Sequence, residues 1–86
     1  MPVVSAFFGM IIRIYHADHN PPHFHVEYGE MEAVIEIKTG SVEQGKLPPR
    51  LLRMIQEWRK LHRFELEREW RVAQERRPLK KIKALE

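Results

Sequence analysis

The sequence predicts an α+β fold, in which an antiparallel sheet of four or five strands carries two helices on one face. In the first half of the chain, apolar and polar residues alternate with a period of two between glycine- and proline-containing turns, which is typical of strands in hairpins. From residue 48 onwards, apolar residues recur at three- and four-residue intervals, which is typical of amphipathic helices. We therefore expect strands over about residues 2–44, helices over about 48–77, and a packed C-terminal tail over 78–86.

Length and composition limit the class of protein. Eighty-six residues suffice for one domain with one modest core, so we expect residues 1–86 to form a single domain. The absence of cysteine excludes disulfides and thiolate metal sites and favours a cytoplasmic protein. No apolar run approaches the roughly 18 residues that a membrane span needs, and the N-terminus lacks the pattern of a signal peptide, so we expect no membrane partner.

The charge is divided unevenly along the chain. Residues 1–45 hold two basic and six acidic residues, a net charge of −4, whereas residues 46–86 hold thirteen basic and six acidic residues, a net charge of +7. The basic half can attract the acidic half, or it can face an anionic partner. A helix surface in contact with water explains the same pattern equally well, so both interpretations stay open.

The first two strands are expected over residues 2–8 and 10–15. The first stretch is apolar apart from one serine in its middle, and Gly9 permits a tight connection to the second. In the second stretch the residues alternate in the pattern of a half-buried strand, and its isoleucines favour that state. The alternation places Arg13 and Tyr15 on one face of the strand.

A turn and a hairpin follow. Residues 18–22 contain aspartate, asparagine and two prolines, which suit a turn because proline cannot continue a strand ladder. Strands are expected over 23–28 and 31–38, joined by a two-residue turn at Gly29-Glu30, with an edge strand over 39–44. The resulting pairs are Tyr28 with Met31, Val26 with Ala33 and Phe24 with Ile35 on an apolar face, and Glu27 with Glu32, His25 with Val34 and His23 with Glu36 on a polar face.

Two helices are expected after the strands. Pro48 and Pro49 suit the first turn of a helix, and apolar residues then recur at helical spacing. One helix from residue 48 to residue 77 would be about 45 Å long, whereas a strand of five or six residues is only ~17–20 Å long. We therefore expect a break near residues 62–64, with Pro78 ending the second helix. The apolar side chains expected to pack on the sheet include Trp58, Trp70, Leu79, Ile82 and Leu85.

Four of the five histidines lie within residues 16–25, which draws attention to one face of the sheet. Residues two apart on a strand point the same way, so His23 and His25 share the polar face. Histidine titrates near neutral pH and arginine can hold a phosphate, so this face suits acid–base chemistry on a phosphodiester. A polar face of an antiparallel sheet in contact with water is the alternative interpretation. The catalytic candidates are His23, His25, Arg13, Tyr15 and Glu36, and the binding candidates are Asp18, His19, Glu27 and Glu32.

A metal site is the second functional interpretation of the same residues. His23 and His25 can share a zinc ion if a third ligand comes from Asp18, His19 or Glu36. However, a His-x-His pair alone has no fixed spacing to a third ligand, and a domain with a hydrophobic core does not depend on an ion to fold. We therefore expect metal-independent chemistry, with no tightly bound structural zinc and no cofactor.

For the polar residues around the turn, a structural role is the alternative to binding a ligand. His16 and His19 flank the turn, where hydrogen bonds from their rings would pin the loop. Asp18 can do the same through an Asx turn. Further along the chain, His62 lies at the expected helix junction, where we expect a hydrogen bond to satisfy it.

Together these residues resemble the domain-of-unknown-function family 4160 of small bacterial proteins. The resemblance runs nearly end to end and depends above all on the string Asp18-His19-x-Pro21-Pro22-His23-Phe24-His25. One departure is Ala84, where the family's pattern leads us to expect proline. Other matching segments are Ser5-x-Phe7 with Gly9, Gly29-Glu30, Gly45-x-Leu47-Pro48, Trp58, His62, Glu65-Leu66, Trp70 and Pro78-Leu79-x-x-Ile82.

The resemblance implies a biological context more firmly than a chemistry, because the family has no settled activity. Its genes resemble the toxin half of toxin–antitoxin pairs, which implies a cognate antitoxin protein as the partner. We therefore predict a toxin that acts in the cytoplasm and cleaves RNA through His23, His25 and Arg13 without a metal ion. The alternative is a non-enzymatic module that binds a protein or a nucleic acid through the same face.

Overall fold

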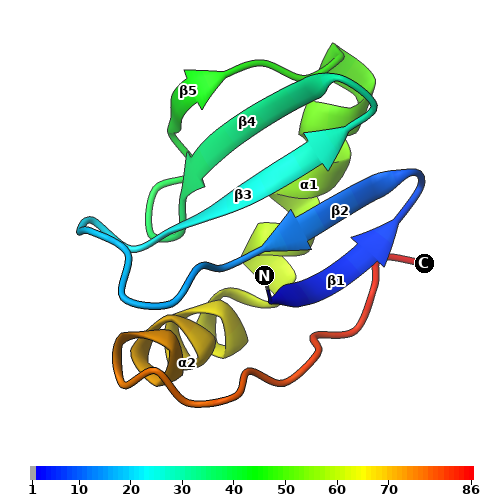
Figure 1. Cartoon of the computed structure of the whole chain (residues 1–86). Helices are drawn as coiled ribbons and strands as arrows, with labels where there is room; N and C mark the ends of the chain where they lie inside the picture. The colour runs from blue at the N-terminus through cyan, green and yellow to red at the C-terminus, as the bar shows by residue number, and fades with distance from the viewer. Residues whose placement is uncertain (1) are drawn as a thin grey trace.

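The computed structural model describes residues 2–86 and contains five strands followed by two helices (Figure 1). Each strand pairs antiparallel with the next, so the strand order in the sheet is β1-β2-β3-β4-β5. The predicted α+β class is confirmed, and the sheet has five of the four or five strands expected. The elements are β1 (Val3–Phe7), β2 (Met10–Arg13), β3 (His23–Tyr28), β4 (Met31–Glu36), β5 (Val42–Gly45), α1 (Pro49–Leu61) and α2 (Arg63–Gln74).

The central hairpin has the predicted register. β3 and β4 pair residue by residue across the two-residue turn, with Tyr28 opposite Met31 and His23 opposite Glu36. Gly29 has a φ of 57°, a left-handed value that the first position of such a turn requires and that glycine adopts without strain. The turn therefore determines which side chains of the two strands share a face.

The apolar face of the hairpin forms the core with α1, which lies behind the sheet in Figure 1. Phe24 and Ile35 are fully buried, as is Trp58 of α1, whose ring centre lies 5.9 Å from that of Phe24. The indole N–H of Trp58 donates a 2.8 Å hydrogen bond to the carbonyl of Lys83, so the polar atom of this side chain is satisfied. The buried residues around them include Val26, Ala33, Ile37, Ile55, Leu66, Trp70 and Ala73, so both tryptophans lie in the core as predicted.

The predicted break between the helices lies at His62. α1 ends at Leu61 and α2 begins at Arg63, and His62 between them has a φ of −117° and a ψ of 24°, which are not helical values. Its Nδ1 lies 2.6 Å from Oε1 of Glu65, which confirms the expected hydrogen bond at this junction. The break divides the segment into helices of 13 and 12 residues, each much shorter than one continuous helix would be.

The two edges of the sheet differ. The C-terminal tail runs beside β1 in Figure 1, and the backbone N–H of Ile82 donates a 2.6 Å hydrogen bond to the carbonyl of Val4. Ile82 is buried in the core, as predicted for the tail. β5 forms the opposite edge, and all its residues are exposed. A Cβ at Gly45, where φ is 74°, would collide with the carbonyl oxygen of Glu32, so the close pairing of β5 with β4 requires glycine there.

Some strand ends differ from the predicted ones. β2 ends at Arg13 rather than at residue 15, and β4 ends at Glu36 rather than at residue 38. The chain leaves the sheet after β2 because the next segment is bonded to α2: the N–H of Ala17 donates a 3.0 Å hydrogen bond to the carbonyl of Ala73. Among residues 2–86, no helix is both long enough and apolar enough to cross a membrane.

Candidate functional site

The loop between β2 and β3 is held against the end of α2. Besides the backbone bond described above, Nε2 of Gln74 donates a 3.0 Å hydrogen bond to the carbonyl of Asp18. Nε2 of His16 donates a 2.9 Å bond to a backbone carbonyl beyond the end of α2, so His16 pins the loop as predicted. The Asn20–Pro21 peptide bond is cis. These contacts set the position of Asp18 relative to β3.

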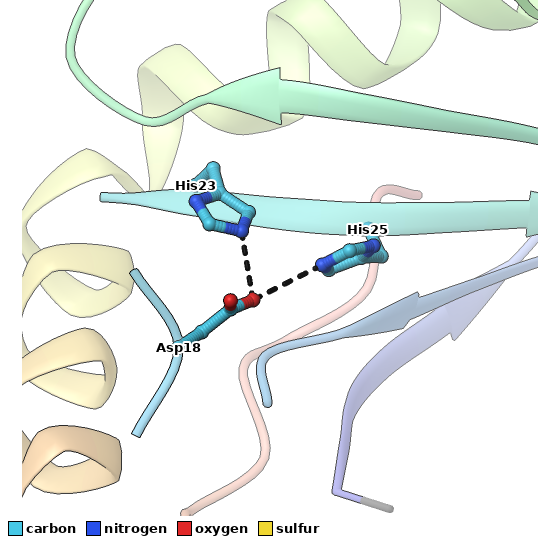
Figure 2. A group of neighbouring side chains, drawn as sticks. All are labelled: Asp18, His23 and His25. Carbon is cyan, nitrogen blue, oxygen red and sulfur yellow. Dashed lines mark hydrogen bonds and ion pairs between the residues drawn. The ribbon is translucent and has the colours of Figure 1, made fainter. Parts of the chain in front are cut away.

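The carboxylate of Asp18 lies next to two imidazoles that project from β3 (Figure 2). Its Oδ2 lies 2.8 Å from Nε2 of His23 and 3.4 Å from Nε2 of His25. Strand geometry had placed the two histidines together, whereas Asp18 was predicted as a binding residue and was one of three candidates for a third metal ligand. The structure puts Asp18 at the centre, and we call Asp18, His23 and His25 the Asp18 cluster.

His23 is buried, which corrects the expectation that both histidines lie on an accessible face. Its exposed fraction is only 4%. Its ring centre lies 5.1 Å from that of Trp70 on α2, and its Nδ1–H donates a 2.7 Å hydrogen bond to the carbonyl of Pro21. The loop and α2 therefore cover the start of β3. Because both ring nitrogens are engaged within the protein, His23 positions the cluster and is not placed to exchange a proton with a substrate.

His25 is the more accessible histidine of the cluster. Its side chain is half-buried, and its ring packs edge-on against Tyr15 with the ring centres 4.4 Å apart. Arg13 is its cross-strand partner, and the Nε–H of Arg13 donates a 2.9 Å hydrogen bond to Oε2 of Glu27. Burial raises the pKa of Tyr15, and the carboxylates of Glu27 and Glu32 raise it further. Tyr15 is therefore protonated near neutral pH and can donate a hydrogen bond beside His25.

The three predicted glutamates, Glu27, Glu32 and Glu36, lie outside the Asp18 cluster. Glu36 is opposite His23 in the register, but within residues 2–86 its side chain makes no hydrogen bond to the cluster. Glu32 is opposite Glu27 and exposed, and its charge is one of the causes that raise the pKa of Tyr15. Cross-strand pairing alone therefore does not bring an acid into contact with the histidines.

Asp18 is held at its other oxygen by His19. The backbone N–H of His19 donates a 2.8 Å hydrogen bond to Oδ1, and Nδ1 of its exposed ring lies 3.0 Å from the same oxygen. An Asx turn needs a bond from two residues on, so the predicted turn is replaced by this bond from the next residue. Burial acts to raise the pKa of Asp18, but hydrogen bonds from His19, His23 and His25 outweigh it and lower the pKa. Asp18 therefore stays ionised at neutral pH.

A hollow of about 210 Å³ opens beside the cluster. β5 contributes Glu43 and Gln44 to its wall, and neither was among the predicted site residues. The strand pairing gives a partial indication that Gln44 lies near the site, because Gln44 pairs with Val34 and Val34 pairs with His25. Small shifts at the end of an edge strand make such second-neighbour positions hard to assign from a sequence. The lining residues are Asp18, His19, Pro21, His23, His25, Val34, Glu43 and Gln44.

The arrangement is suited to two kinds of chemistry. Imidazoles in contact with an ionised carboxylate can accept and donate protons. Nitrogen and oxygen atoms that converge on one point can also hold a divalent metal ion. Within residues 2–86, the Asp18 cluster is the one group of three such side chains whose ligand atoms all lie within 4.8 Å of one another.

Comparison with known proteins gives one match. The model of a family described as "Domain of unknown function (DUF4160)" matches residues 9–71, which is most of the chain. The matched segment runs from the turn before β2 into α2 and contains the whole Asp18 cluster. No curated protein and no solved structure matches the chain.

Proposed function

The chain belongs to the domain of unknown function family DUF4160, and from this premise we propose that it is the toxin of a toxin–antitoxin system and cleaves RNA at the Asp18 cluster. The observation that carries the proposed chemistry is the ionised Asp18 carboxylate between Nε2 of His23 and Nε2 of His25, beside a hollow. The toxin role is supported by the resemblance of the sequence to a family whose genes resemble toxin genes.

The proposed reaction is RNA cleavage by transesterification, in which a phosphoryl group passes from a 5′-oxygen to a neighbouring 2′-oxygen. A ribose 2′-oxygen loses its proton and bonds to phosphorus, while the bond from phosphorus to the 5′-oxygen breaks and that oxygen gains a proton. The reaction therefore needs groups that accept and donate protons near neutral pH, which imidazole does well. No external oxidant or reductant is required.

The geometry changes the roles that the sequence assigned to the histidines. His23 and His25 were predicted to act as a pair, but His23 is buried and both its nitrogens are engaged. His19 lies on the other side of the Asp18 carboxylate, and its side chain is 80% exposed. His25 and His19 are therefore the imidazoles that a substrate can reach, and Arg13 lies beside His25 as its cross-strand partner.

The proposed partner is a cognate antitoxin protein, and the proposed place of action is the cytoplasm. The helical half of the chain carries a net charge of +7, which suits an acidic protein surface or the phosphates of RNA. Expression in bacteria with and without the neighbouring gene tests the toxin role. Growth arrest that the neighbour relieves is the expected outcome, whereas absence of any effect on growth would favour the non-enzymatic binding module.

The chemical role is tested by His25→Ala. We expect this variant to lose growth arrest while it keeps its fold, because the half-buried side chain leaves no apolar core cavity. His62→Ala is the control, since it removes a histidine–carboxylate contact at the helix junction, away from the cluster. Growth and thermal melting are measured on the same variants. A folded His25→Ala protein that still arrests growth would overturn the proposed role of this residue.

A further inference from the structure

We propose that Asp18, His23 and His25 bind one divalent transition-metal ion, with zinc as the ion that best fits, through Oδ2 of the aspartate and Nε2 of each histidine. The role of the ion in catalysis rests on the proposed function, because the ion would be a cofactor of the same centre. The binding itself is argued from the geometry, the hydrogen bonds and the charge around these three side chains.

The distances are close to those of a ligand set. Nitrogen and oxygen ligands lie about 2.0–2.2 Å from zinc, so neighbouring ligand atoms in tetrahedral or octahedral geometry are roughly 3–3.5 Å apart. Oδ2 of Asp18 lies 2.8 Å from Nε2 of His23 and 3.4 Å from Nε2 of His25. All three atoms lie within 4.8 Å of one another. Small side-chain rotations are therefore enough to enclose an ion.

The hydrogen bond at the far side of His23 orients its ring for a cation. Nδ1 donates its proton to the carbonyl of Pro21, so Nε2 donates to the Asp18 carboxylate only when the ring carries a second proton, and in the neutral ring it directs a lone pair there. A lone pair 2.8 Å from an ionised oxygen is repulsive unless a proton or a metal ion lies between them. Metal-binding histidines usually donate their other ring N–H to a carbonyl or carboxylate in this way.

Asp18 is oriented by a second hydrogen bond. Its Oδ1 accepts the backbone N–H of His19, which leaves Oδ2 directed toward the two histidines. The loop that carries Asp18 is also hydrogen-bonded to the end of α2, so both the backbone and the carboxylate of Asp18 are held in place. Supporting hydrogen bonds of this kind hold metal ligands in position.

The charge around the cluster also favours a cation. The polar face next to it carries the carboxylates of Glu27, Glu32 and Glu36, and Glu43 lines the hollow, while the guanidinium of Arg13 is bonded to Glu27. Such a face attracts metal ions and repels the phosphates of RNA. A bound divalent ion would offset this repulsion and supply a contact for a phosphate oxygen.

Two imidazoles and one carboxylate leave at least one coordination position open, as in catalytic rather than structural zinc sites. The hollow of about 210 Å³ beside the cluster gives water or a substrate access to that position. A water molecule bound there would lose its proton more readily than bulk water, so it could replace the imidazole as the proton-accepting group. Because the fold has its own core, the chain should stay folded without the ion.

The test uses the full-length chain, purified without a histidine tag and treated with a chelator. Calorimetric titration with zinc and visible absorption on titration with cobalt measure binding directly, at neutral pH and at about pH 5.5, where histidines compete for protons. We expect one equivalent to bind, with affinity that falls at the lower pH. Asp18→Asn and His25→Ala should each weaken binding more than about tenfold, whereas His62→Ala should bind as the wild type does.

Two results would overturn the inference: no saturable binding, or binding that the cluster variants leave unchanged. Thermal melting of each variant shows that a loss of binding is not a loss of fold. Because binding is measured without RNA and without cells, it is separate from the growth assay. Metal binding by a non-toxic chain would overturn the proposed function alone, and growth arrest by a chain that binds no metal would overturn this inference alone.

Discussion

On one face of β3, Phe24 and Val26 are fully buried among apolar side chains, and on the other face His23 and His25 surround the carboxylate of Asp18. His23 is almost as inaccessible as Phe24, with an exposed fraction of 4% against 0%. Burial alone therefore does not distinguish the core from the candidate site. On the apolar face, hydrocarbon side chains exclude water. On the cluster face, both ring nitrogens of the buried His23 have hydrogen-bonding partners.

The difference between the two faces has energetic consequences. Buried apolar side chains stabilise a fold roughly in proportion to the area that they remove from water. A buried polar group contributes little net free energy when it is hydrogen-bonded, but losing its partner costs about 1–3 kcal/mol. We therefore expect the apolar face to dominate the free energy of unfolding and the cluster face to dominate the response to protons and metal ions.

Phe24→Ala should have the largest effect on stability. Truncating this fully buried ring against Trp58 leaves a cavity in the core, and the free energy of unfolding should fall by about 3–5 kcal/mol. That loss is a large part of the stability of a small domain. Urea denaturation measures it, with Phe24→Leu as the control that keeps most of the apolar volume. Equal losses of stability for the two variants would show that the apolar volume at position 24 does not determine the stability of the core.

His23→Ala should have an intermediate effect. It removes the partner of the Pro21 carbonyl and one partner of Asp18, and it leaves a gap next to Trp70, so we expect a loss of about 1–3 kcal/mol. The same denaturation measurement on His25→Ala gives the comparison within one strand. His25 is half-buried and makes only the longer contact with Asp18, so its loss should be smaller. A larger loss for His25→Ala would reverse the roles assigned to the two histidines.

Asp18→Asn should have the smallest effect on stability at neutral pH and the clearest effect on its pH dependence. The folded pKa of Asp18 is lowered, so between the folded and unfolded pKa values the unfolded chain binds more protons. The carboxylate therefore contributes stability above about pH 4 and loses it as the pH falls through the folded pKa. Urea midpoints should show the difference between the wild type and the variant shrinking below about pH 4. A difference that grows with acid would contradict the lowered pKa.

The amino-acid sequence by itself determined the order of the elements, because the signals for them are local. Alternation identified the strands, and the two-residue turn at Gly29-Glu30 set the register of β3 and β4. That register placed His23 and His25 on one face without any knowledge of the tertiary structure. The break at His62 followed from the mismatch between the length of one long helix and the length of a strand.

Only the tertiary structure decided what surrounds the histidines. His23 is covered because Trp70 of α2 packs against its ring at the start of β3, whereas His25 lies further along the strand and is only half-buried. Asp18 meets both rings because its loop is bonded to the end of α2 through Ala17. These contacts join segments far apart in the chain, and they depend on where a helix ends relative to a sheet. Periodicity reports which face a residue occupies, but it carries no information on what another segment places over that face.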